Sequence, residues 1–283
     1  NLGTDPRFGT CLARTVTGHG QTFRRTTKPA DVSAKETPML PDEYQKLSEH
    51  EDSMWWYRAL HRNVLWALRN AQAPVAGELL DAGCGTGGIL RKIGATCPGV
   101  NLFGLEIVPL AARAAQQKSG ATVVAASVDA MPFKDGIFTV IVSADVLYHR
   151  WVDPASAAAE AFRCLRPGGL FIVNVPANEW MRSNHDEAVF GAVRFSRRGI
   201  LGVLNQAGFQ VPYISYWNSV LFPLMIVRRL LFGQTNAGSD VKKYPVLLDC
   251  LFSAALWLEH GLMRAGVRFP FGGSILAIGV KHE

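Results

Sequence analysis

A glycine-rich segment at residues 81–88 offers the clearest chemistry in this sequence. It reads Asp-Ala-Gly-Cys-Gly-Thr-Gly-Gly, and it begins where a predicted strand at 78–81 ends and leads into a predicted helix at 89–95. A turn with so few side chains lets a ligand lie against the backbone at the start of the helix. Because nicotinamide and flavin enzymes use related turns, the segment alone indicates a cofactor site without identifying the cofactor. The residues that we expect to contact the ligand are Asp81, Gly83, Cys84, Gly85 and Gly87.

Two acidic residues follow later β-rich runs. Glu106 closes the run at 101–106, and Asp129, with Ala130 beside it, follows the run at 121–125. Ligands of an open α/β sheet bind outside the carboxyl ends of the strands, so both acids are expected near the glycine turn. Their carboxylates would accept hydrogen bonds from hydroxyl or amino groups of a ligand. The alternatives are a surface acid for Glu106 and an ordinary turn for Asp129.

Together these features resemble the class I methyltransferase family over residues 78–174. Residues 81–87 look like the first motif of that family, and Glu106 looks like its ribose-binding acid. The Asp129 loop looks like its adenine-binding site. The sequence Leu-Arg-Pro-Gly-Gly at 165–169 looks like the family's turn between a helix and a strand.

The resemblance implies S-adenosylmethionine as cofactor. It also implies an α/β fold with a Rossmann-like seven-stranded sheet, of which the last strand is antiparallel. By the same resemblance, residues 142–149, which include Ala144, line the reacting end of the cofactor. This segment lacks the Asn/Asp-Pro-Pro-aromatic sequence of amino-group DNA methyltransferases, which argues against a nucleobase acceptor.

The elements that must position these residues alternate between β-rich runs and helical stretches, which is typical of a parallel sheet with crossover helices. The run at 138–143 is almost continuously apolar, as expected of a central strand with helices on both faces. Asp153 followed by Pro154 predicts the start of a helix, and Gly208 predicts the end of another. The predicted strands are 78–81, 101–106, 121–125, 138–143, 170–175, 209–216 and 274–280.

The rest of the chain divides into additions around this catalytic core. Residues 1–37 lack apolar periodicity and predict a mobile tail. Residues 38–283 form the predicted methyltransferase domain, in which 38–73 show helical spacing. Residues 217–273 are too long for an ordinary loop and predict a helical lid inserted before the last strand.

Methyl transfer is an in-line displacement, so the protein must mainly align the nucleophile and exclude water. A hydroxyl acceptor would benefit from a base. His149, just after the fourth predicted strand, is the first candidate, and a structural histidine is the alternative. His185 with Asp186 is the second candidate, and a pair that closes a loop is its favoured alternative. Asp145 resembles the metal-binding acid of catechol-type enzymes, but no matching ligands are recognisable, so no metal is predicted.

The acceptor is expected to be an apolar small molecule or a lipid-like molecule, because the segments around the site are strongly apolar. A plain core helix is the alternative interpretation for residues 55–58. Lys and Arg are scattered despite a net charge of +6, so no nucleic-acid partner is predicted. The residues that we expect to line the acceptor pocket are Trp55, Tyr57, Tyr148 and Trp180.

Compartment and membrane contact rest on weaker signals. The five cysteines contain no C-x-x-C pair, which favours a reducing, cytoplasmic compartment. The apolar stretches at 220–227 and 246–258 are shorter than the roughly 18 to 20 residues of a spanning helix, so none is predicted. Apolar residues around Arg228 and Arg229 would suit a peripheral contact with a membrane surface, and packing on the sheet is the alternative.

Two other classes of function stay open at this point. One is a nicotinamide-dependent oxidoreductase, which is disfavoured because no Ser/Tyr/Lys catalytic set can be placed in the sequence. The other is a non-catalytic module that uses the cofactor fold to bind a partner or a membrane surface.

Overall fold

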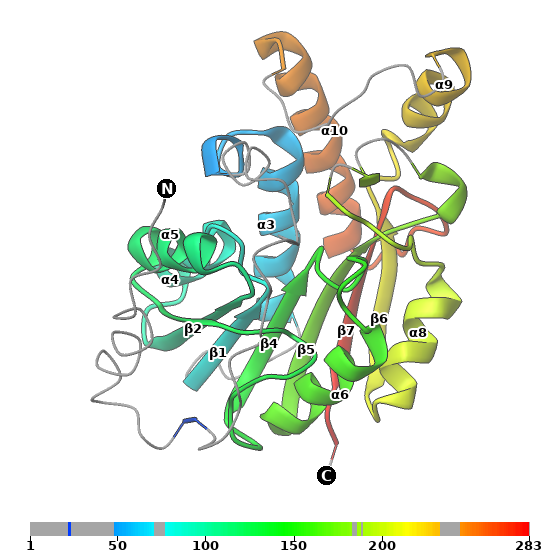
Figure 1. Ribbon diagram of the computed structural model, residues 1–283. Helices are drawn as coiled ribbons and strands as arrows, with labels where there is room; N and C mark the ends of the chain where they lie inside the picture. The colour runs from blue at the N-terminus through cyan, green and yellow to red at the C-terminus, as the bar shows by residue number, and fades with distance from the viewer. Residues whose placement is uncertain are drawn as a thin grey trace.

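A computed structural model describes residues 22–23, 48–70, 77–182, 186–187, 189–232 and 244–282. Its core is a seven-stranded sheet in the order β3-β2-β1-β4-β5-β7-β6 (Figure 1). Strands β1 to β5 pair in parallel, whereas β7 runs antiparallel to both β5 and β6, which confirms the predicted fold class. The strands are β1 Gly77–Ala82, β2 Val100–Glu106, β3 Thr122–Ala125, β4 Phe138–Ala144, β5 Leu165–Pro176, β6 Gln210–Trp217 and β7 Ser274–Val280.

Helices cover both faces of the sheet. Alternate residues of a strand enter different cores: Leu80 and Ile141 pack on the side of α6 and α8, and Leu79 packs on the side of α3 and α10. Strand β4 is buried along almost its whole length, as expected of the central strand. The helices are α3 Trp55–Asn70, α4 Gly88–Thr96, α5 Pro109–Ser119, α6 Pro154–Cys164, η1 Glu179–Met181 (a 3-10 turn), α8 Arg197–Gln206, α9 Phe222–Phe232 and α10 Val246–Arg264.

Helix starts follow the local signals. The Asp153 carboxylate accepts a hydrogen bond from Ser156 N at 3.0 Å and caps α6, with Pro154 as the first helical residue. Strand β5 differs from the prediction, which began it at residue 170. It begins at Leu165 because that residue pairs with Phe138, and the next pair, Val140 with Leu170, leaves residues 166–169 of β5 as an irregular bulge. The turn predicted at 165–169 is therefore the irregular first part of strand β5.

The additions are described in part. Helix α3 confirms helical structure before the sheet, while residues 38–47 and 71–73 lie outside the described residues. The predicted mobile tail also lies outside them, except for residues 22–23, where Phe23 bridges to Phe133 and their rings lie 5.4 Å apart. The predicted helical insertion is confirmed by α9 and α10, between which residues 233–243 are not described.

Helix α10 is longer than the apolar stretch at 246–258 from which no spanning helix was predicted. It continues to Arg264, and by length and composition its 19 residues could cross a membrane, with a mean hydropathy of 1.4. The prediction ended the stretch before Glu259 and His260, two polar residues that prove to be inside the helix. Core helices of soluble proteins pass the same test, so this finding alone does not place α10 in a membrane.

Candidate active site

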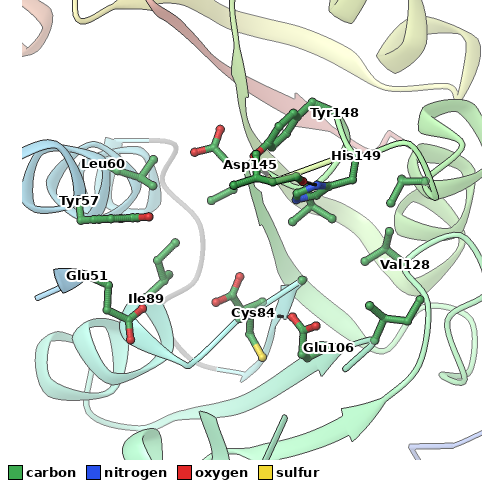
Figure 2. Close-up of a pocket in the computed structure, with 18 of the residues that line it drawn as sticks. Glu51, Tyr57, Leu60, Cys84, Ile89, Glu106, Val128, Asp145, Tyr148 and His149 are labelled. Carbon is green, nitrogen blue, oxygen red and sulfur yellow. Dashed lines mark hydrogen bonds between the residues drawn. The ribbon is translucent and has the colours of Figure 1, made fainter. Parts of the chain in front are cut away.

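A cavity of about 190 Å³ lies at the carboxyl ends of β1, β2 and β4. The topology of the sheet places it there, because the loops that follow the neighbouring strands β1 and β4 lead to opposite sides of the sheet and leave a crevice between them. Figure 2 shows Glu51, Cys84 and Glu106 on one side of the cavity and Asp145, Tyr148 and His149 on the other. Tyr57 and Leu60 of α3 form a third wall. The cavity therefore brings together the glycine turn and the segment after β4, as the sequence predicted.

The glycine turn needs glycine for two reasons. Gly83, Gly85 and Gly87 have φ angles of 85°, 54° and 90°, in the left-handed region that other residues rarely adopt. A Cβ on Gly83 would lie 2.3 Å from a methyl of Val146, and one on Gly87 would lie 2.8 Å from Cα of Ala115. Gly83 and Gly85 line the cavity, whereas Gly87 shapes the turn against α5.

Asp81 is a buried acid without a hydrogen-bond partner in the described part of the chain. Only 1% of it is exposed, and neither carboxylate oxygen receives a hydrogen bond. Burial, with added repulsion from Glu106 and Glu51, raises its pKa to about 8. Such an orphaned carboxylate is costly unless a ligand pairs with it. Because Asp81 lines the cavity, a cationic group of a ligand would supply the missing partner.

Glu106 is held at the end of β2 by backbone groups. Its Oε2 accepts a hydrogen bond from Gly85 N and its Oε1 accepts one from Val108 N, each at 3.0 Å. The carboxylate thus links the glycine turn to the cavity that it lines. Asp129 and Ala130 do not line the cavity themselves. They follow directly in sequence after Ser127 and Val128, which do. Their contact with the cofactor stays a prediction.

Glu51 is a site residue that the sequence reasoning missed. Its carboxylate accepts hydrogen bonds from Thr86 Oγ1 at 2.6 Å and Gly88 N at 3.2 Å, and pairs with Lys118 Nζ at 2.5 Å. The segment before α3 is thereby held across the glycine turn. Gly88 permits this approach, because a Cβ there would lie 2.4 Å from Glu51 Oε2. No motif marks such a contact, although the acid is four residues before the aromatic run at 55–57.

Asp145, which was considered from the sequence only as a metal-binding acid, begins a buried polar chain that was not predicted. It is held at φ 55°, and its Oδ1 accepts a hydrogen bond from Asn174 Nδ2 at 3.0 Å. Asn174 Oδ1 in turn accepts one from Trp217 Nε1 at 2.7 Å. Burial raises the pKa of Asp145 to about 7, although the Asn174 hydrogen bond and the Arg194 charge oppose the rise. A carboxyl with this pKa exchanges its proton near neutral pH.

His149 and Tyr148 lie side by side on the cavity wall, with ring centroids 4.3 Å apart. His149 Nδ1 is 2.8 Å from the carbonyl oxygen of Val189. Since a carbonyl only accepts hydrogen bonds, the neutral ring carries its proton on Nδ1, and Nε2 is its basic nitrogen. Burial raises the pKa of the Tyr148 hydroxyl well above its usual range, so it stays protonated.

The other predicted residues divide into two groups. Ala144 and Tyr57 line the cavity, as expected. Trp55 instead packs against Phe252 of α10, with ring centroids 5.3 Å apart, and Trp180 is 60% exposed. The predicted roles of these two tryptophans are not tested by this placement.

His185 lies outside the described residues. Its neighbour Asp186 makes a buried two-point ion pair with Arg194, at 2.9 and 3.0 Å. The predicted lid, residues 217–273, contributes no described residue to the cavity wall. It supports that wall from behind, because Trp217 stacks on Trp56 at 5.7 Å.

Known proteins resemble this chain in sequence and in fold. A family model described as a methyltransferase domain matches residues 80–173. The 24-methylenesterol C-methyltransferase 2 of Oryza sativa subsp. japonica is 30% identical over 230 residues, which are 67% of this chain and 61% of the rice protein. A probable S-adenosylmethionine-dependent methyltransferase of Mycolicibacterium smegmatis is 25% identical over 162 residues, 56% of this chain and 60% of that protein.

Among solved structures, phosphoethanolamine N-methyltransferase 2 of Haemonchus contortus, in complex with S-adenosyl-L-methionine, superposes with a TM-score of 0.53 at 11% identity. The match covers 85% of this chain and 60% of that one, and at this identity it shows the fold alone. The chain belongs to the class I S-adenosylmethionine-dependent methyltransferases, a family that uses S-adenosylmethionine as its cofactor. It spans about 60% of the length of both curated relatives named above.

The residues present fit this cofactor. Asp81 would pair with the amino group of S-adenosylmethionine, and this would give the buried carboxylate the hydrogen-bond partner that it lacks in the described part of the chain. Glu106 would accept hydrogen bonds from its ribose hydroxyls at the cavity edge. The side-chain-free turn at Gly83 and Gly85 leaves room for the cofactor against the backbone.

Proposed function

We propose that this protein transfers the methyl group of S-adenosylmethionine to an apolar small-molecule or lipid-like acceptor. The observation that carries the proposal is the composition of the cavity beside the methyl-reacting end. Apolar and aromatic side chains dominate that wall, and the polar groups there are few: His61, Asp145, Tyr148 and His149. The apolar part of the wall consists of Trp56, Tyr57, Leu60, Trp151, Val152 and Val189. The rice relative, named as a sterol C-methyltransferase, supports a lipid-like acceptor.

The bound cofactor supplies an electrophilic methyl group, and the chain supplies alignment, exclusion of water and control of a proton. In the proposal, His149 takes the proton of a hydroxyl or amino acceptor at Nε2. This nitrogen can accept a proton because the Val189 carbonyl holds the ring proton on Nδ1. Tyr148, which stays protonated, donates a hydrogen bond to the acceptor. His185 remains the second candidate base, outside the described residues.

Partners and location belong to the proposal as well. An apolar acceptor that partitions into lipid would be reached most readily at a membrane surface, so we place the protein in the cytoplasm with peripheral membrane contact. The four cysteines of the described part, Cys84, Cys97, Cys164 and Cys250, are all free, which suits a reducing compartment.

The test is methyl transfer from a labelled donor to a total lipid and metabolite extract. The purified chain is incubated with S-adenosylmethionine carrying a heavy methyl group, and extract components that gain its mass are identified by mass spectrometry. The proposal expects a labelled apolar product that is absent with Asp81→Asn. Label found only in water-soluble polar metabolites would contradict it.

Two outcomes would favour the other classes of function. Protection against heat by a nicotinamide cofactor, but not by S-adenosylmethionine, would favour an oxidoreductase. Tight cofactor binding without any labelled product would favour a non-catalytic binding module.

A further inference from the structure

A second cavity, of about 740 Å³, runs between α3 and α10 outside the cofactor site. Five cationic side chains line it, and no acidic residue is among the lining residues in the described part of the chain. Arg58 has partners, since it donates to Asp249 and Ser253 at 2.5 Å each. No ion pair of the described residues involves the other four, which are Arg62, Arg69, Lys92 and Arg264.

Burial and the clustered positive charge of this groove lower the pKa of titratable groups within it. Burial lowers the pKa of His260 to about 4, and the charges of Arg62 and Arg264 add to the effect. The pKa of Arg62 is lowered by burial and by Arg58, although Glu259 opposes this. The Arg62 guanidinium also lies 4.4 Å over the ring of Trp257, and its buried Nε has no hydrogen-bond partner. A focused positive site of this kind attracts an anion.

The groove lies beside an exposed apolar helix face. Leu247, Leu251, Leu258 and Leu262 recur at helical spacing on the outer face of α10 and are 72%, 56%, 63% and 39% exposed. A helix that faces water normally carries polar residues there. Leu224 and Leu230 of α9 are 52% and 79% exposed, and in Figure 1 both helices project beyond the carboxyl ends of β4 and β5.

The opposite face of α10 is anchored in the domain. Glu259 accepts hydrogen bonds from the backbone N–H groups of Ser219 and Val220, at 2.7 and 2.9 Å. His260 is hydrogen-bonded to Asn63 of α3 at 2.8 Å. A helix that crossed the bilayer would have to give up these buried contacts, so α10 is suited to lie along a membrane surface instead.

We propose that the groove between α3 and α10 binds the phosphate of an anionic phospholipid, while the exposed leucines of α10 enter the same membrane surface. The arrangement matches both parts of a lipid, since the cationic side chains and tryptophans of the groove lie beside an exposed apolar helix face. Arg229 of α9 has a smaller part in this contact than the sequence suggested, because its Nη1 donates a hydrogen bond to the Met181 carbonyl at 2.6 Å. The cofactor cavity opens at the same edge of the sheet, so a lipid-like acceptor could pass directly from the membrane to the active site.

The test is co-sedimentation of the full chain with vesicles of phosphatidylcholine, with and without 30% phosphatidylglycerol. Arg69→Glu with Arg264→Glu should lower the affinity for anionic vesicles roughly tenfold or more. The control pair, Lys134→Glu with Arg198→Glu, makes the same charge change at exposed positions away from the groove and should bind like wild type. Leu247→Ser should weaken binding, whereas Leu110→Ser, at a position 74% exposed on α5, should not.

Three further readings decide the outcome. Cofactor binding and circular dichroism check that each variant is folded, and a salt titration of the wild type tests the electrostatic part without any variant. Sedimentation of the groove pair equal to that of the control pair would overturn the proposal. Binding of inorganic phosphate in the groove without vesicle binding would overturn it too, because the site would then take a free anion. The proposal would also be overturned if the wild-type chain did not sediment with the anionic vesicles.

Discussion

The cofactor side and the acceptor side of this cavity are built in different ways. On the cofactor side, the turn between β1 and α4 and the end of β2 come from short contiguous segments whose backbone requires glycine. On the acceptor side, Tyr57, Asp145 and His149 come from α3 and from the loop after β4, and Trp217 supports them from the insertion. The family match at 80–173 covers the first side and also the loop after β4, but it does not include α3 or the insertion. We therefore expect the shared fold to fix the cofactor, and α3 together with the loop after β4 to select the acceptor.

The largest effect is expected on the acceptor side, at His149. If this residue is the base for a hydroxyl acceptor, His149→Ala should lower kcat by roughly 100-fold or more and leave cofactor affinity unchanged. The reason is that the basic Nε2 is lost while the glycine turn is not touched. Steady-state kinetics with the identified acceptor, together with calorimetry of cofactor binding, measure the two quantities. A loss of less than about threefold would make His149 structural.

Glu106→Ala should act on the other side of the comparison. It removes an acceptor of cofactor hydrogen bonds and leaves the N–H groups of Gly85 and Val108 unpaired, so cofactor binding should weaken by about 1 to 3 kcal/mol. Isothermal titration calorimetry gives the value. The affinity of Asp129→Asn for the cofactor serves as a comparison, because Asp129 is next to Val128 in sequence but does not itself line the cavity. Unchanged affinity in Glu106→Ala would remove it from the ribose role.

Glu51 joins the two sides, and a smaller effect is expected there. Glu51→Gln should weaken cofactor binding roughly threefold to tenfold, because the charged contacts with Thr86, Gly88 and Lys118 that hold the segment over the turn become weaker. Asp52→Asn is the control: Asp52 also pairs with Lys118, at 3.1 Å, and with Arg91 of α4, but in the described part of the chain it makes no hydrogen bond to residues 83–88. Equal losses in both variants would show that only the ion pairs matter.

The smallest effect concerns pH. The pKa of Asp81 is raised to about 8 and that of Asp145 to about 7, against about 4 for an aspartate in an unfolded chain. Between these limits the folded state holds more protons than the unfolded state, so the stability of the cofactor-free protein should fall as pH rises from about 4 to about 8. Its Tm should drop by a few degrees between pH 5 and pH 8. Asp81→Asn should flatten this dependence, and an equally steep profile in that variant would contradict the assigned pKa.

What could be predicted from the sequence follows the same division. The glycine turn and Glu106 were accessible because each depends on a local pattern, whereas the seven-stranded sheet with its antiparallel last strand was implied by the resemblance to the family. One error was also local: Leu165 pairs with Phe138 in a strand, where the sequence predicted a turn. The apolar stretch at 246–258 gave only part of α10, which continues through Glu259 to Arg264.

The missed residues depend on contacts between distant parts of the chain. Glu51 reaches Thr86 across 35 positions, and Asn174 links Asp145 to Trp217 across 29 and 43 positions. No periodicity or spacing announces such contacts in one sequence. The same holds for the cationic groove, whose residues are scattered along α3, α4 and α10 and become a cluster only when these helices pack together.

Calorimetric titration with S-adenosylmethionine tests the central claim most directly, with Asp81→Asn as the paired variant. The account predicts one binding site per chain, roughly 10- to 100-fold weaker in the variant, because the buried carboxylate can no longer pair with the cofactor's amino group. When the acceptor identified in the extract is added to the wild-type sample, methylated product should appear together with an equal amount of the demethylated cofactor. Absence of binding, or equal affinity in wild type and Asp81→Asn, would contradict the account of this cavity as the site of a methyltransferase.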